Sequence, residues 1–120
     1  MKAYVGERTI DGIVVTVAGR PLDPRMETAC FSRNGFEWSY EGPEPRQLAF
    51  ALLLDHLSDE ALAKTLVDPF MKAVVANFDN DWTMTSDDMA AALEALSRSA
   101  GWKGMTFVDG RPPEAKAGHS

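Results

Sequence analysis

The chain has 120 residues, of which 45% are hydrophobic and 25% charged, and a formal net charge of −6. This length fits one domain, which can bury a core without metals or disulfides. The longest unbroken apolar run, residues 48–54, is too short to span a bilayer, and the charged N-terminus is unlike a signal peptide. The lone cysteine, Cys30, excludes an intrachain disulfide and favours a reduced, cytoplasmic setting.

The first third of the chain predicts an antiparallel sheet. Residues 3–8 and the valine-rich residues 13–17 favour strands, and Asp11-Gly12 is typical of the turn between hairpin strands. Residues 20–22 are expected to pair back briefly at an edge, because proline has no backbone donor. Residues 36–40 alternate aromatic and polar side chains, which predicts a further strand with its aromatic residues on one face.

The middle of the chain predicts two helices. Two prolines suit the first turn of a helix, and residues 47–57 are apolar nearly all round, which indicates a central helix packed on the aromatic face of the sheet. Ser58, followed by two acids, is expected to cap a second helix. Asp68-Pro69 predicts either a kink in that helix or a new start.

The last part of the chain predicts one more helix. A short extended piece at 82–84 precedes Thr85 or Ser86, either of which can cap the helix, with Asp88 at a capping-box position. Ala100-Gly101 should end it, residues 102–108 suggest a final strand, and 109–120 are expected to be a disordered tail. We therefore expect a single α+β domain over residues 1–108, with a small antiparallel sheet of three to four strands in its N-terminal third packed against three to four helices.

Negative charge is concentrated in the second half. Residues 1–40 hold five acids and five bases, whereas residues 55–96 hold nine acids and two lysines. Such a segment is a poor match for phosphate backbones, so no direct nucleic-acid contact is expected. Solvated helix faces explain these acids most simply, and an acidic surface for a basic partner is the sharper alternative. The candidate partner-binding residues are Asp79, Asp81, Asp87, Asp88, Glu94, Glu41 and Glu44.

Catalytic and metal-binding patterns are weak. His56 lies on the apolar helix, where a structural role is favoured, and a Cys30–His56 nucleophile pair has no supporting motif. The Asp79/Asp81 and Asp87/Asp88 pairs lack the calcium-loop pattern. Aromatic residues at 36, 38 and 40 suggest base stacking, but they have no basic neighbours, so core packing is favoured. We expect no catalytic residue, no metal and no cofactor.

One stretch resembles a known family. That family of small uncharacterised proteins, found in phages, plasmids and bacterial genomes, has a Tyr-x-Gly-x-Arg start, a Gly-Phe-Glu-Trp core motif that runs into Gln-Leu-Ala, and a later Trp. The resemblance covers roughly residues 3–85 and implies a mobile-element context without an activity. The matching residues are Tyr4, Gly6, Arg8, Gly19, Leu22, Gly35, Phe36, Glu37, Trp38, Tyr40, Gly42, Pro45, Gln47, Leu48, Ala49 and Trp82.

The chain departs from that family in the turn before the central helix. The family's glycine-rich turn would offer backbone N–H groups at a helix N-terminus, which suits an anion. Here Ser39, Glu41, Pro43 and Glu44 occupy the turn, so added carboxylates and a lost donor disfavour phosphate. We therefore expect no anion site at this turn.

Three functions follow as hypotheses. The favoured one is a non-catalytic protein of a mobile element that binds the basic surface of a host protein, most specifically an inhibitor of a bacterial defence system such as an anti-CRISPR protein that holds a CRISPR effector subunit. The second is a homodimeric regulatory or structural accessory protein that associates through Trp102, Met105 and Phe107. The third, an enzyme or nucleic-acid binder that uses the sheet face, is the least favoured. No membrane association is expected.

Overall fold

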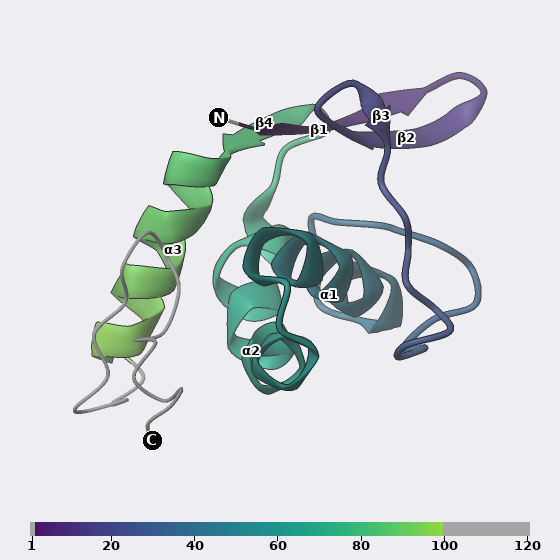
Figure 1. The fold of residues 1–120 in the computed structure, drawn as a ribbon. Coiled ribbons are helices and arrows are strands. Elements are labelled where there is room, and N and C mark those ends of the chain that lie inside the picture. Colours follow the sequence, from purple (N-terminus) through teal and green to yellow (C-terminus); the bar gives the residue numbers. More distant parts are fainter. Residues whose placement is uncertain (1, 100–120) are drawn as a thin grey trace.

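The structure of the chain is a computed structural model, which describes residues 2–99. Its sheet lies on one side, α1 lies between the sheet and α2, and α3 runs away from the end of β4 (Figure 1). The α+β prediction is confirmed. The strands are β1 (Ala3–Thr9), β2 (Gly12–Val17), β3 (Arg20–Pro21) and β4 (Trp82–Thr85), and the helices are α1 (Pro43–Leu57), α2 (Glu60–Ala73), the short 3-10 helix η1 (Val75–Asn77) and α3 (Ser86–Ser99).

The four strands form one antiparallel sheet in the order β3-β2-β1-β4. Three of the four come from the first 21 residues, as the hairpin signals predict. Alternation along β1 sends Tyr4 and Gly6 to the buried face, and its β2 neighbour Val15 faces the same way. Within residues 2–99, the helices lie on this face of the sheet (Figure 1).

The predicted strand at residues 36–40 is wrong. This segment has no regular secondary structure, and β4, far along the chain, is the fourth strand instead. Its backbone bonds elsewhere: Ser39 N–H donates to Val75 O in η1 (3.1 Å), and Trp38 N–H donates to the Glu37 carboxylate (3.1 Å). Ser39 also has φ 79°, a left-handed conformation that interrupts a strand.

Helix α1 is buried over almost its whole length, as its all-round apolar sequence predicts. Two prolines in its first turn leave few backbone donors to satisfy there. The helix ends at Ser58, which adopts a left-handed conformation (φ 54°) and donates its N–H to Leu54 O at 2.8 Å. The central position predicted for this helix is therefore confirmed, although no aromatic strand at 36–40 exists for it to pack on.

Helix α2 differs from the prediction in its N-cap, and it decides between the two alternatives predicted at Asp68-Pro69. Its N-cap is Asp59 rather than Ser58, because the Asp59 carboxylate accepts the Leu62 N–H at 3.0 Å. The helix runs through Pro69 without a new start. Arg46 of α1 pairs with Asp68 at 2.6 Å and ties the two helices together.

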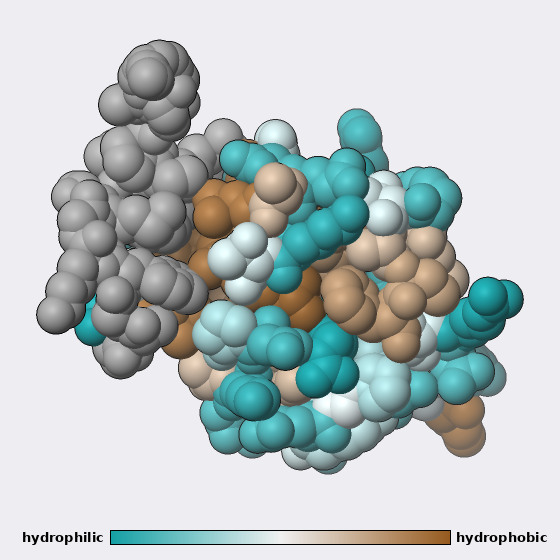
Figure 2. Space-filling model, turned by 90° about the horizontal axis from the view of Figure 1, so that it is seen from below, coloured by the Kyte–Doolittle hydropathy of each residue, from teal (hydrophilic) through white to brown (hydrophobic). Residues whose placement is uncertain are grey.

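Seen from the helical side, hydrophilic residues cover much of the surface and hydrophobic ones gather near its centre (Figure 2).

Helix α3 begins with the predicted capping box. Thr85 N–H donates to Asp88 Oδ2 at 3.0 Å, and Asp88 N–H donates to Thr85 Oγ1 at 3.1 Å. Met89 and Leu93 are buried on its apolar side, as predicted. The helix end at Ala100-Gly101, the strand at 102–108 and the tail at 109–120 lie outside the described residues.

Candidate functional site

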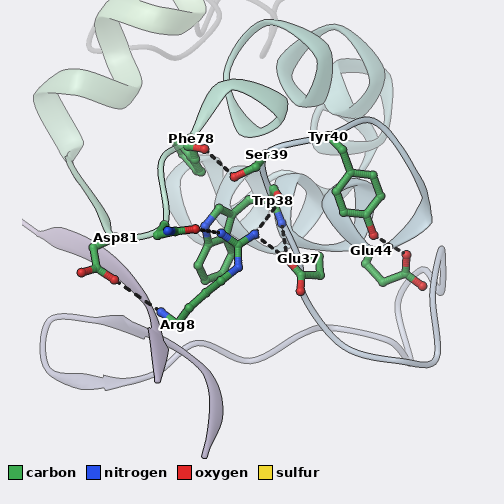
Figure 3. Close-up of polar contacts among 9 residues, drawn as sticks. Arg8, Glu37, Trp38, Ser39, Tyr40, Glu44, Phe78 and Asp81 are labelled. Carbon is green, nitrogen blue, oxygen red and sulfur yellow. Dashed lines mark hydrogen bonds and ion pairs between the residues drawn. The ribbon is translucent and has the colours of Figure 1, made fainter. Parts of the chain in front are cut away.

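Arg8 connects the sheet to the segment before α1 (Figure 3). Its Nη2 donates to Glu37 Oε1 at 2.7 Å and to Trp38 O at 2.8 Å, and its Nη1 donates to Asn80 Oδ1 at 2.6 Å. The guanidinium also lies 4.7 Å from the centre of the Trp38 ring, within range of a cation–π contact. One side chain therefore joins β1, the irregular segment and the loop before β4.

Trp38 anchors this segment in the core. Its ring is fully buried and meets Trp82 edge to face, with ring centres 5.7 Å apart. Trp82 in turn stacks on Phe78 at 4.2 Å. The Ser39 hydroxyl donates to Phe78 O at 2.5 Å, so the segment is held by backbone and ring contacts together. The prediction that Trp38 is a core residue is confirmed.

Tyr40 differs from Trp38, because 44% of its surface is exposed. Its ring is nevertheless fixed: the hydroxyl donates to Glu44 Oε1 at 2.9 Å, and the ring edge closes over Gly42. Partial burial, the Glu44 hydrogen bond and the nearby Glu44 and Glu37 charges raise the Tyr40 pKa, in that order, while Arg8 opposes them. Hydrogen bonds, above all from Tyr40 and then from Asn34, lower the Glu44 pKa.

An open groove of about 650 Å³ lies beside Tyr40. We call it the Tyr40 groove; one side is formed by Gly12 and Ile13 of β2, and the other by residues 34–37, Tyr40 and Glu44. Phe36 and Ile13 are partly buried against the core and supply apolar wall. The groove thus combines an exposed, fixed aromatic ring with two carboxylates.

Residues 4–95 match a family of unknown function, DUF6166. The chain belongs to the DUF6166 family. No curated protein and no solved structure matches the chain. The region matched by DUF6166 includes all of β1 after Ala3, the segment between β3 and α1, and β4, so it covers the Arg8 contacts and the whole Tyr40 groove.

In this DUF6166 protein, the side chain of Gln47 holds the irregular segment between β3 and α1 in place. Its side chain is fully buried; Oε1 accepts the N–H groups of Phe31 (2.6 Å) and Ser32 (3.1 Å). Its Nε2 donates to Pro24 O at 2.7 Å and Ala29 O at 3.0 Å. Four main-chain groups of this irregular loop are thus hydrogen-bonded to a single side-chain amide. These bonds take the place of the backbone hydrogen bonds that a neighbouring strand would provide.

The seven predicted acidic residues lie in three places. Asp87, Asp88 and Glu94 are on α3, Asp79 and Asp81 are in the loop before β4, and Glu41 and Glu44 lie just before α1 and in its first turn. Several already have partners: Asp88 caps α3, Asp81 Oδ1 accepts the Arg8 N–H at 3.4 Å, and Glu94 pairs with Arg98 at 3.9 Å. Of the seven, only Glu44 lines the Tyr40 groove. Their role in partner binding stays a prediction.

Among residues 2–99, no group of three or more His, Cys, Asp or Glu side chains is placed to hold a metal ion. His56 is buried in the last turn of α1, whereas Cys30 is exposed in the loop before that helix. None of the described helices has the length and apolarity needed to cross a bilayer.

Arg8, Glu37 and Ile13 belong to the site, although no pattern in the sequence predicts a binding role for them. The sequence offers two signals for Glu37. It directly precedes a tryptophan, and it is one of only five acids in residues 1–40, where acids and bases are equal in number. No local signal pairs it with Arg8, which is 29 residues away. The Tyr40 groove requires β2 and the segment before α1 to meet, and that contact is purely tertiary.

Proposed function

We propose that this protein is a non-catalytic binding protein that holds a partner protein by a basic surface. The Tyr40 groove is the observation that carries this proposal, because it offers an exposed, fixed aromatic ring next to two carboxylates. Aromatic residues are enriched at protein interfaces, and a ring that is already fixed loses little entropy when a partner docks. The net charge of −6 favours association with a basic partner.

The specific form of the proposal is an inhibitor of a bacterial defence system, encoded by a mobile element and acting in the cytoplasm. A CRISPR effector subunit is the partner class we favour, since effectors carry basic channels for nucleic acid. The small size of the chain and the resemblance to proteins of phages and plasmids support this form. Under it, the acids at Asp79, Asp81 and Asp87 add to the attraction.

Affinity capture with the full chain, followed by binding measurements with the purified partner, tests the proposal. We expect one stoichiometric protein partner whose affinity falls as salt rises. Neutralising Asp79 and Asp87 together should weaken binding about tenfold at low salt, in keeping with the modest energy of exposed charge pairs. Glu27→Gln, at an exposed position of the loop after β3, is the matched control and should leave the affinity unchanged.

Salt-independent binding, or unchanged binding after the Asp79 and Asp87 changes, would reject the acidic surface. Catalytic turnover of a substrate by the purified chain would reject the non-catalytic proposal. Phage-challenge assays in a strain with an active CRISPR system test the specific form, which predicts loss of immunity when the chain is expressed.

A homodimeric accessory protein is the second candidate. Ile10 is fully exposed at the hairpin tip, and Val14 is 45% exposed on β2. Trp102, Met105 and Phe107, the residues predicted to associate, lie outside the described residues. Light scattering over a range of protein concentrations separates the candidates, because a monomer at every concentration contradicts the dimer.

A further inference from the structure

We propose that the Tyr40 groove binds an arginine side chain of the partner protein. This inference rests on the proposed function and names the chemical group that the groove recognises. It depends on three features of the groove: its aromatic wall, the acceptor positions of its two carboxylates, and the small number of free backbone donors in the first turn of α1 beside it.

The aromatic wall is suited to a planar cation. Tyr40 is 44% exposed, yet its hydroxyl is bonded to Glu44 and its ring lies against Gly42. Phe36 lines the same groove. A guanidinium stacks on such rings and gives up its hydration more readily than an ammonium group does.

The carboxylates of Glu37 and Glu44 keep acceptor positions that no described residue uses. Each carboxylate oxygen can accept about two hydrogen bonds. Glu44 Oε2 accepts from Ser32 and Asn34, and its Oε1 accepts from Tyr40. A backbone hydrogen bond also contributes to the lowered Glu44 pKa. Glu37 Oε1 accepts from both the Arg8 guanidinium and the Trp38 N–H. Glu37 Oε2 has no donor among the described residues.

Acceptors on two separate carboxylates favour a ligand with several donors that point in different directions. Arginine has five N–H donors in a planar fork, whereas lysine has three on one nitrogen. The chain already shows this recognition on the inner side of Glu37, where Arg8 bonds Oε1 and lies over Trp38 (Figure 3). The same carboxylate presents its other oxygen to the partner.

The first turn of α1, at the edge of the groove, offers few free donors to an anion. Pro43 and Pro45 have no N–H in the first turn of α1, and the Arg46 N–H is already bonded to Gly42 O at 3.0 Å. The Glu44 carboxylate at the same turn repels a phosphate. The groove therefore selects for positive charge.

Chemical-shift titration of the full chain with short capped peptides tests the inference. The probes share one Gly/Ser sequence and carry Arg, Lys, citrulline or Glu at the centre. We expect the Arg peptide to shift the amide signals of residues 12–13, 34–37 and 40, and the citrulline peptide, which has the same shape without charge, to bind about tenfold more weakly. Inorganic phosphate should shift none of these signals.

Matched variants assign the effect to the groove. Tyr40→Leu removes the ring and Glu44→Gln removes one charge while it keeps an acceptor; each should weaken the Arg peptide about tenfold. Glu27→Gln, at an exposed position of the loop after β3 and outside the groove lining, is the control and should bind the peptide as the unchanged protein does. The spectra themselves report whether each variant is folded.

Equal shifts from the Arg and citrulline peptides, or groove signals that do not respond, would overturn the inference. Groove signals that shift when the protein alone is concentrated would also overturn it, because the occupant would then be a second copy of the chain. If a purified partner binds but tolerates Tyr40→Leu and Glu44→Gln, the groove inference fails; the proposed function then keeps its partner but loses the groove as the binding surface. If no partner protein is found, the proposed function fails, and a partner's arginine is then no longer the occupant of the groove, whatever the peptides show.

Discussion

The indole ring of Trp82 lies directly over Gly6, its cross-strand neighbour in the sheet. A Cβ at position 6 would collide with the Cε2 and Nε1 atoms of that ring. Trp82 cannot move aside cheaply, because it is stacked on Phe78 and meets the edge of Trp38. We expect Gly6→Ala to lower the free energy of unfolding by about 1–3 kcal/mol, measured by urea denaturation.

The same change in a Trp82→Leu background identifies the cause. Leucine leaves room over position 6, so the alanine should then cost much less than in the unchanged protein. An equal cost in both backgrounds would show that the ring is not what excludes a side chain at position 6.

Arg8 should be irreplaceable by lysine. Its guanidinium reaches the Glu37 carboxylate, the Trp38 carbonyl and Asn80, and one ammonium cannot bond all three in those directions. We expect Arg8→Lys to destabilise the fold by about 1.5–3 kcal/mol in denaturant titrations, the range for hydrogen bonds to charged groups. Arg20→Lys, at an exposed position of β3, should change the stability little. Similar losses for both variants would contradict this role for Arg8.

Gln47 should control the order of the loop before α1. Gln47→Leu keeps the size of the side chain but leaves the N–H groups of Phe31 and Ser32 without an acceptor, at a cost on the order of 3 kcal/mol. Hydrogen exchange should then speed up at both amides. Gln47→Glu, fully buried and so favoured as the neutral acid, keeps the acceptor and has one donor where the amide has two. The two amides should stay protected, while one of the loop carbonyls of Pro24 and Ala29 loses its bond. Unchanged exchange in Gln47→Leu would contradict the assignment.

Local sequence signals predicted the hairpin, the central helix and the capping box, because each depends on residues close in the chain. Asp11-Gly12 is followed by β2, and Thr85 and Asp88 bond each other as their spacing predicts. The strand prediction at 36–40 failed for the opposite reason. An alternating pattern sets which side chains are apolar, but the backbone there bonds to η1 and to Glu37 instead of to a strand. The Tyr40 groove could not be predicted from local sequence signals either, since its walls come from segments more than 20 residues apart.

The boundary between α1 and α2 gives a direct test of the corrected cap. Asp59→Ala removes the bond to the Leu62 N–H and should destabilise the fold by about 1 kcal/mol, whereas Ser58→Ala should cost little. Ser58→Gly should stabilise the fold by about 0.5–1 kcal/mol, because the residue has φ 54° and glycine adopts that conformation freely. A larger loss for Ser58→Ala than for Asp59→Ala in thermal or urea unfolding would restore Ser58 as the cap.

Ionisation of Tyr40 should be delayed to high pH. Burial and the bonded Glu44 carboxylate raise the Tyr40 pKa above its ordinary 10.0, so the folded state favours the neutral phenol. The stability that this phenol contributes is complete below pH 10.0 and is lost as the pH rises through the raised pKa of the folded state. The opposite sign applies to Glu44, whose lowered pKa gives a contribution that is lost as the pH falls through it.

Carbon NMR of labelled tyrosine rings measures this pKa directly, with Tyr4 as the second, buried tyrosine. Glu44→Gln removes the Glu44 charge and should bring the Tyr40 pKa down toward its ordinary value, since burial, a weaker hydrogen bond and the Glu37 charge, which Arg8 opposes, then remain. Glu41→Gln changes a carboxylate that is not among the causes of the shift and should leave the pKa where it is. A Tyr40 pKa that is the same with and without the Glu44 charge would show that the pair does not form in solution, and the fixed ring of the Tyr40 groove would then lose its support.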